Sequence, residues 1–253
     1  MRIKKLHILL ISLAICACAI PVRGRLFRPI IGGIQMVKGK KTIADRISQY
    51  GEVVQQRLAP SFSQVQVGIT YPPKKMTIIG FKEERMVQVW VAGDGGTWKH
   101  LKDYPILGMS GNLGPKLKEG DLQVPEGLYR LESLNPNSLY HLALRVNYPS
   151  PEDCRRASDE GRTETGLGSD IMIHGKNCSV GCLAMGDEAA EDLFILAAIV
   201  GVKNVTIILS PVDFRVRGLP KIMPPVPVWT KDLYASIRQE LGKYKVSVVQ
   251  KGR

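Results

Sequence analysis

The chain has 253 residues, of which 44% are hydrophobic and 23% are charged. These shares are ordinary for globular proteins and exclude a disordered or collagen-like chain. The length suffices for one sizeable core or two small ones. The formal net charge of +12 favours an anionic partner. Nucleic acid is not predicted as a partner, because the basic residues are scattered and no basic patch is interleaved with aromatic residues.

The first 24 residues differ from the rest of the chain. A basic start is followed by an almost wholly apolar run, Ile8 to Ile20, and by the small-x-small sequence Ala17-Cys18-Ala19. This order is typical of a secretory signal peptide, so we expect export to the periplasm or cell envelope. A retained membrane anchor, or lipidation at Cys18, remains an alternative. No later run is long and apolar enough to cross a bilayer.

A basic, glycine-containing leader at residues 25–41 precedes the first predicted helix. From Thr42 to Leu58, apolar residues recur on one helical face, and Thr42 is of a type that caps helices. Short β-branched runs at residues 65–71, 76–81 and 86–92, with turn residues between them, then predict strands.

The middle of the chain also favours strands. Residues 108–127 are rich in glycine and proline and predict a long loop. Further strands are expected at residues 128–131, 139–146 and 171–173. Because helices do not alternate with these strands, the sheet should be mainly antiparallel. The predicted fold class is mainly β, in the α+β sense, with a few flanking helices.

The last part of the chain mixes helix and strand. A helix is expected from Asp187, which can cap it, with Leu193, Leu196, Ala197 and Val200 on one face. A strand at residues 204–209, a proline-rich linker at 220–227 and an amphipathic helix at 230–241 follow. The predicted organisation is a signal peptide (1–24), a leader and amphipathic helix (25–59), a catalytic domain (60–218), and a proline-rich linker with a C-terminal helix (219–253).

The segment from Ile171 to Cys182 carries the residues with chemical potential. A short apolar strand ends at His174, and Gly175 allows a sharp turn. Seven residues separate His174 from Cys182, enough for the chain to loop back and bring the imidazole beside the thiol. The helix expected just beyond would place its positive end near Cys182 and favour a thiolate.

An imidazole beside a thiol is the arrangement of a cysteine nucleophile with its general base. A free thiol has a pKa near 8.5, so a neighbouring base is needed to activate it for attack on acyl carbons. The amides of Gly181 and Cys182 are expected to face the developing oxyanion. A structural role for His174 and Cys182 is the alternative. A zinc site of His174, Cys178 and Cys182 is disfavoured, because the spacing fits no common zinc module and lacks a fourth ligand.

At this point the sequence resembles a known family. His174-Gly175 followed by Ser179-Val-Gly-Cys182 is similar to the signature of the YkuD-like L,D-transpeptidase catalytic domain. The spacing is shorter than in familiar members, and Val180 stands where they carry a second His. This form resembles the YafK-like murein L,D-transpeptidase subgroup. The resemblance covers roughly residues 60–215 and includes the segments Gly114–Asp121, Pro125–Tyr129, Leu134–Ser138 and Asn147–Pro149.

The resemblance implies a β-rich catalytic domain with Cys182 as nucleophile and His174 as base. Gly175 would lie where the family orients the imidazole with a backbone carbonyl or a Ser, and Ser179 and Gly181 would shape the catalytic loop. The implied substrate is a peptidoglycan stem peptide containing a diamino acid. The thiol would attack the carbonyl of its L-centre, release the terminal D-residue and form a thioester. No metal or cofactor is required.

Three further residues are candidates for substrate binding. Arg215 follows a strand and a turn, where it would hold a carboxylate, although a solvated surface Arg is the more common situation. Lys116 lies in a segment that matches the family, and Tyr129 would line the cleft unless it is a core residue.

The cysteine count gives a prediction about disulfides. With Cys16 and Cys18 in the signal, three cysteines remain, and an odd number in an oxidising compartment suggests one free thiol. With Cys182 assigned as the free thiol, Cys154 and Cys178 are left to pair, and two free thiols are the alternative.

Three functions remain open at the level of sequence. The first is L,D-transpeptidation, in which an amine resolves the thioester. The second is hydrolysis, in which water resolves it, acting on peptidoglycan cross-links or on links between an envelope lipoprotein and peptidoglycan. The third, from another class, is non-catalytic peptidoglycan binding, against which the presence of both His174 and Cys182 argues.

Overall fold

The computed structural model describes residues 39–65 and 69–245. The predicted signal peptide and most of the predicted leader lie outside these residues. The compact unit begins at Thr42. The α-helices are α3 (Ile43–Gln64), α4 (Pro151–Asp159), α5 (Asp187–Val200) and α6 (Thr230–Leu241), with short 3-10 helices at Glu164–Gly166 and Val202–Asn204. The strands are β1 (Lys75–Phe81), β2 (Met86–Ala92), β3 (Trp98–Pro105), β4 (Gly127–Ser138), β5 (His141–Val146), β6 (Met172–His174), β7 (Leu183–Ala184) and β8 (Val205–Ser210).

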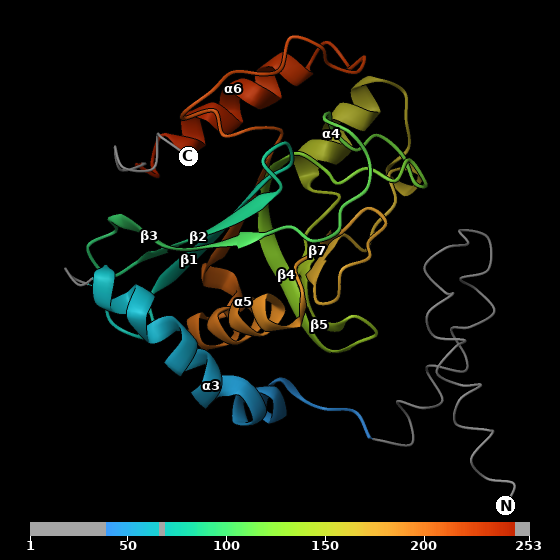
Figure 1. Ribbon diagram of the computed structural model, residues 1–253. Helices are drawn as coiled ribbons and strands as arrows, with labels where there is room; N and C mark the ends of the chain where they lie inside the picture. The colour runs from blue at the N-terminus through green and yellow to red at the C-terminus, as the bar shows by residue number, and fades with distance from the viewer. Residues whose placement is uncertain (1–38, 66–68, 246–253) are drawn as a thin grey trace, which may run out of the picture. The chain divides into compact units, whose positions relative to one another are not determined.

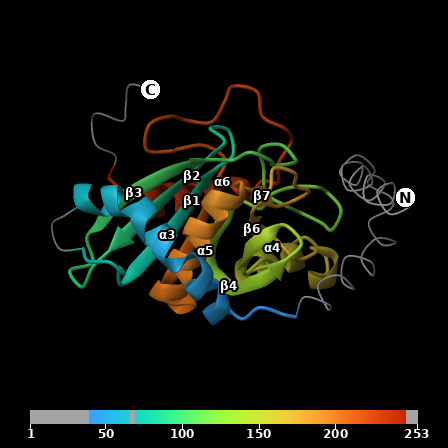
Figure 2. The ribbon, with the colours of Figure 1, turned by 60° about the horizontal axis from the view of Figure 1, so that its bottom comes forward.

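The strands form one eight-stranded sheet in the order β3-β2-β1-β8-β4-β5-β6-β7. Most neighbouring pairs are antiparallel, as predicted, but β1 with β8 and β6 with β7 are parallel. The predicted fold class, mainly β with flanking helices, is confirmed. The parallel β6–β7 pair ends the sheet and carries the residues of the candidate site (Figure 2).

Both faces of the central strands are covered by helices. Side chains alternate across a strand, so Ile78 joins a core with α3 and α5, whereas the adjacent Ile79 joins a core with α6. Figure 1 shows α3 and α5 below the sheet and α6 above it. This arrangement explains why β1 is buried at every position after Lys75. A strand buried on both faces has an apolar run without alternation.

Helix α3 is longer than the sequence predicted. Thr42 caps it through a capping box with Asp45, in agreement with the prediction. The helix continues to Gln64 because its apolar face continues: Phe62, one turn after the buried Leu58, also packs on the core. The predicted strand at residues 65–71 is therefore wrong where the structure describes it.

Two other strands differ from the prediction. β3 was not predicted, because an edge strand with charged residues such as Lys102 and Asp103 lacks the apolar run of a central strand. β4 continues well beyond Leu131, through a register shift between Leu131 and Ser133. Glu132 is exposed by the regular alternation, and Ser133, at the irregularity, is exposed as well.

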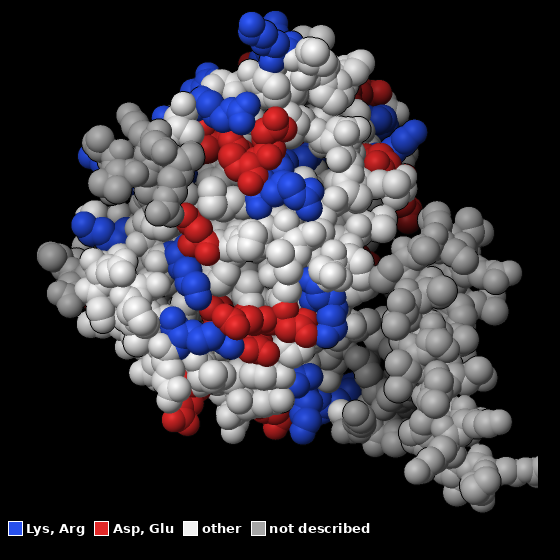
Figure 3. Space-filling model, in the orientation of Figure 1, with Lys and Arg blue, Asp and Glu red and all other residues white. Residues whose placement is uncertain are grey.

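The surface carries mixed charge. On the face shown in Figure 3, Lys and Arg side chains lie next to Asp and Glu side chains, and no single sign dominates. Among the described residues, no helix has the length and apolar content needed to cross a membrane.

Candidate active site

Two short strands bring His174 and Cys182 to the same edge of the sheet. β6 and β7 pair in parallel, with Ile173 opposite Leu183 and His174 opposite Ala184. One residue earlier in this register, Cys182 lies opposite Met172, whose amide donates a hydrogen bond to Cys182 Sγ at 3.3 Å. Diagonal neighbours on adjacent strands are about 7–8 Å apart, so the His174 and Cys182 backbones lie within side-chain reach.

The thiol of Cys182 is held by the backbone at the start of β6. Besides accepting from the Met172 amide, Sγ donates to the carbonyl oxygen of Asp170 at 3.5 Å. Asp170 has a positive φ of 62°. The thiol points toward these backbone groups and makes no hydrogen bond to His174 within the described part of the chain. It must rotate to reach the imidazole.

The imidazole of His174 is fixed in one orientation and one tautomer. Its Nδ1–H donates to the carbonyl oxygen of Gly175 at 2.6 Å, so Nε2 of the neutral ring is the proton acceptor. The ring of Tyr140 lies over it, with centroids 4.7 Å apart and planes inclined by 34°. Burial lowers the pKa of His174, and the bond to Gly175 opposes this shift only in part. His174 is therefore a mostly neutral base at pH 7.

Burial raises the pKa of the Cys182 thiol, and the nearby Asp170 carboxylate raises it further. The hydrogen bond from the Met172 amide, the second-largest influence after burial, lowers the pKa, as do Ser179 and Lys116, but the net shift is upward. The helix whose dipole was expected to favour a thiolate, α5, begins at Asp187. Asp187 does not cap α5, since the N-cap is Gly186 and the Asp187 carboxylate instead accepts from the Lys176 amide. The resting pair is thus a thiol and a neutral imidazole.

The expected oxyanion donors are not open. The Gly181 amide donates to Ser110 Oγ at 2.7 Å, and the Cys182 amide donates to Ser179 Oγ at 3.1 Å. Either hydroxyl must move before its amide can bind a substrate oxygen. That both amides face the oxyanion therefore stays a prediction, and it requires these hydroxyls to move.

The loop at residues 108–127 packs against the catalytic loop. Gly108 pairs with Ala184, and a Cβ at Gly108 would lie 2.2 Å from the carbonyl oxygen of Asn177, so only glycine fits there. Gln123 approaches Gly181 from the same side: a Cβ on Gly181 would lie 3.6 Å from the Gln123 carbonyl oxygen. This long loop therefore forms one wall beside Cys182.

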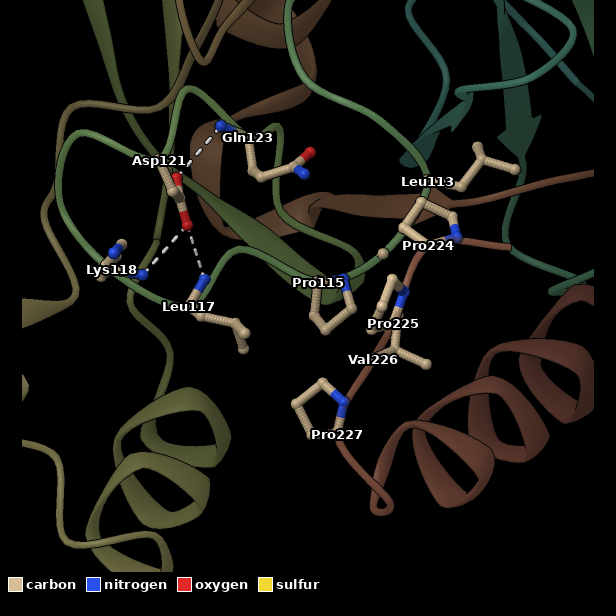
Figure 4. A pocket seen from close by; sticks show the side chains of 11 residues that line it. Leu113, Pro115, Leu117, Lys118, Asp121, Gln123, Pro224, Pro225, Val226 and Pro227 are labelled. Carbon is tan, nitrogen blue, oxygen red and sulfur yellow. Dashed lines mark hydrogen bonds between the residues drawn. The ribbon is translucent and has the colours of Figure 1, made fainter. Parts of the chain in front are cut away.

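The same loop encloses a cavity of about 170 Å³ with the proline-rich segment before α6. Figure 4 shows Pro224, Pro225 and Pro227 facing Pro115 across it. Asp121 organises the loop by accepting hydrogen bonds from the amides of Leu117, Lys118 and Gln123. The Asp121 carboxylate thereby holds the part of the wall that contains Gln123.

The three candidate substrate-binding residues have different surroundings. Lys116 is buried and pairs with Asp121, close enough to Cys182 to lower its pKa. Tyr129 is 3% exposed and its hydroxyl donates to the Glu126 carbonyl oxygen, which makes it a core residue.

Arg215 is occupied inside the protein. Its guanidinium donates to the Asp213 carboxylate, to Gln88 and to the Tyr244 carbonyl oxygen, and it stacks on Phe81. All three of its nitrogens are used, so it does not hold a substrate carboxylate in this structure. The predicted role of Arg215 is not supported.

Cys154 and Cys182 are free thiols, so Cys154 is not bonded to Cys178. The expected Cys154–Cys178 bond is therefore wrong for this structure. Within residues 39–65 and 69–245, no group of three or more His, Cys, Asp or Glu side chains is placed to hold a metal ion.

Four residues of the site were not found from the sequence. Ser110 covers the Gly181 amide, Asp170 binds the thiol through its carbonyl, Tyr140 covers His174, and Arg145 bonds the Asp170 side chain. None lies in a motif. Only the position of Asp170, directly before the predicted strand, carried a signal that could have placed it near Cys182.

Known proteins are similar to part of this chain. No family model matches the sequence. A protein of Escherichia coli K12 described as "Putative L,D-transpeptidase YafK" is 36% identical over 116 residues, which is 45% of this chain and 44% of that protein. The protein of the same description from strain O157:H7 matches equally well. The chain thus matches less than half the length of these curated relatives.

Solved structures are also similar. Pgp2 of Campylobacter jejuni, a helical cell shape determining protein, has a TM-score of 0.40 and 23% identity over 60% of this chain and 54% of its own. Bd1075 of Bdellovibrio bacteriovorus has the same score and identity over 71% and 58%. Likeness at these TM-scores does not by itself establish a shared fold. The sequence match nevertheless confirms that the chain resembles the L,D-transpeptidase family in its YafK-like form.

Proposed function

We propose that the protein is an L,D-transpeptidase-type cysteine acyltransferase that acts on peptidoglycan stem peptides. One structural observation supports this most: the parallel β6–β7 pairing places Cys182 diagonally from His174, whose Nε2 is the free proton acceptor. The likeness to YafK supports the choice of reaction and substrate.

In the proposed reaction, the Cys182 thiol rotates away from the Asp170 carbonyl and gives its proton to His174 Nε2. The thiolate attacks the carbonyl carbon at the L-centre of the diamino acid. The C–N bond to the terminal D-residue breaks, and His174 returns the proton to the leaving amine. An amine then attacks the acyl carbon of the thioester, a C–N bond forms as the cross-link, and the C–S bond to Cys182 breaks. His174 takes the proton of the amine and returns it to the released Cys182 thiolate.

The Gly181 and Cys182 amides must become free before they can bind the oxyanion in this scheme. The carbonyl oxygen of the substrate gains negative charge during attack and needs hydrogen-bond donors. Because Ser110 and Ser179 cover the Gly181 and Cys182 amides, substrate binding must displace at least one hydroxyl.

The test is incubation of the full chain with purified muropeptides, followed by mass spectrometry of the products. Release of the terminal D-residue with formation of dimers supports transpeptidation. Release without dimers, or loss of existing cross-links or of lipoprotein–peptidoglycan links, indicates a hydrolase instead. Binding without any product, in wild type as in Cys182→Ser, would leave only a non-catalytic binder.

We also propose that the enzyme works in the periplasm or at the cell envelope, on the basis of the sequence of residues 1–24. N-terminal sequencing of the protein from cell fractions should recover a start near residues 20–25 in the envelope fraction. Recovery of Met1 on most of the protein would contradict signal cleavage.

A further inference from the structure

Beside the thiol lies a row of three charged residues that the catalytic scheme does not use: Glu132 on β4, Arg145 on β5 and Asp170 before β6. Arg145 donates from Nε to Glu132 at 2.7 Å and from Nη1 to Asp170 at 2.6 Å. Asp170 is also the residue whose carbonyl oxygen binds the Cys182 thiol. Asp170 therefore links this row of charges to the Cys182 thiol.

The sheet register places Arg145 near Cys182. Arg145 pairs with Met172 on β6, and Met172 donates its amide to Cys182 Sγ. Two strand spacings thus separate the backbones of Arg145 and Cys182, about 10 Å. If the carbonyl of a bound peptide lies at the thiol, the side chain next to that carbonyl can reach Glu132, Arg145 and Asp170.

The three side chains remain accessible. The exposed fractions are 32% for Arg145, 48% for Glu132 and 59% for Asp170. Ion pairs at such exposure are weak, so a ligand's charges can exchange with them. Arg145 also keeps Nη2 without a hydrogen-bond partner among the described residues, unlike Arg215, whose nitrogens are all used.

The signs of the charges decide the ligand. The order along the row is negative, positive, negative, so its net charge is negative. A lone carboxylate would be repelled by the two acids, and a lone ammonium would leave the Arg145 donors unused. A group with an ammonium and a carboxylate on the same carbon meets both signs at once.

We propose that Glu132, Arg145 and Asp170 form a subsite that binds the free amino acid end of the substrate's diamino acid, with its carboxylate on Arg145 and its ammonium on the acids. This inference rests on the proposed peptide substrate and names the part of it that the enzyme recognises. It makes Arg145 a specificity-determining residue.

The chain supplies a matched control. On α4, Arg155 bonds Glu152 and Asp159, which gives the same three residue types; the two acids are about as exposed as Glu132 and Asp170, and Arg155 is more exposed than Arg145. Unlike Arg145, this triad lies within one helix and has no bond to the catalytic loop. Arg155→Ala therefore removes an equivalent surface charge without touching the proposed subsite.

The test measures binding by calorimetry in the full-length Cys182→Ala background, so that turnover is not needed. Three stem tetrapeptides are compared: one unmodified, one with a carboxamide at the free end of the diamino acid, and one with that amine acetylated. Arg145→Ala should weaken binding of the unmodified peptide about tenfold to a hundredfold. In this variant the unmodified peptide should no longer bind more tightly than the carboxamide peptide. Arg155→Ala should change binding less than about twofold. Asp170→Asn should reduce the advantage over the acetylated peptide.

Equal losses for all three peptides in Arg145→Ala, or equal effects of the Arg145 and Arg155 variants, would overturn the subsite. Wild-type turnover measured in parallel separates this result from the proposed function. If the binding pattern holds but wild type makes no product, the proposed reaction is wrong and the subsite stands. If wild type is active without the binding pattern, the reaction stands and the subsite is wrong.

Discussion

The protonation state of Cys182 gives a prediction that distinguishes this site from a thiolate–imidazolium pair. Burial raises the pKa of the thiol and lowers the pKa of His174, so both groups should be neutral at rest near pH 7. A thiol with a pKa of 8.5 is about 3% thiolate at pH 7, and a raised pKa makes this an upper limit. Alkylation of Cys182 by iodoacetamide should therefore run at about 3% or less of its high-pH rate.

The assay follows the rate of alkylation from pH 5 to pH 10 in a Cys154→Ala/Cys178→Ala variant, with the label located by peptide mass spectrometry. The rate should rise steadily through neutral pH and still be rising above about pH 9, because the pKa of the thiol is raised. His174→Ala should shift this profile little, because no ion pair is lost. A rate already at its plateau at pH 6, which collapses in His174→Ala, would refute the assignment of a neutral resting pair.

Three further predictions concern stability and the thiols. Glu126→Ala should lower the free energy of unfolding by about 3–5 kcal/mol in a denaturant titration, because the buried Lys82 ammonium loses its only carboxylate partner among the described residues and keeps two backbone carbonyls. Glu240→Gln, which breaks the more exposed pair with Lys243, should cost less than about 1 kcal/mol, and equal losses would contradict this. Gly175→Ala should lower the free energy of unfolding by about 1–3 kcal/mol and reduce turnover, because its Cβ would lie 2.8 Å from the Tyr140 carbonyl oxygen. An unchanged melting temperature and unchanged activity would contradict this prediction. Peptide mapping without reductant should find Cys154 as a free thiol, and a disulfide-linked peptide would contradict the structure.

The elements with strong periodicity were predictable from the sequence. α6 spans Thr230–Leu241 as expected, and α5 begins at the expected Asp187, because their apolar residues recur at helical spacing. β1 and β2 were found for a related reason, since their β-branched runs are bounded by turn residues. The elements that failed lacked such a signal.

The pairing of strands was not predictable. The parallel contact of β1 with β8 joins residues more than 120 positions apart, and nothing local in either strand specifies its neighbour. The same holds for the parallel β6–β7 pair, which decides the position of Cys182 relative to His174. The sequence predicted that these residues approach one another, but not by which strand geometry.

The details of the site depend on contacts between distant segments. Gly181 was expected to offer its amide to a substrate, but Ser110, from a loop more than 70 residues earlier, occupies it. Likewise, the dipole argument for Cys182 considered only the nearby helix, whereas burial determines the direction of its pKa shift. Burial of a side chain is a property of the folded chain and cannot be judged from local sequence.

The intact mass of the full-length protein after brief incubation with a stem tetrapeptide is the decisive measurement. The proposed reaction predicts a gain equal to the mass of the tetrapeptide minus the mass of the free D-amino acid that it releases. This mass is carried as a thioester on Cys182 and is absent in Cys182→Ala. Peptide mapping should place the added mass on the segment that contains Cys182. A wild-type protein that releases the D-residue without ever carrying this mass, or a Cys182→Ala variant that carries it, would contradict Cys182 as the nucleophile.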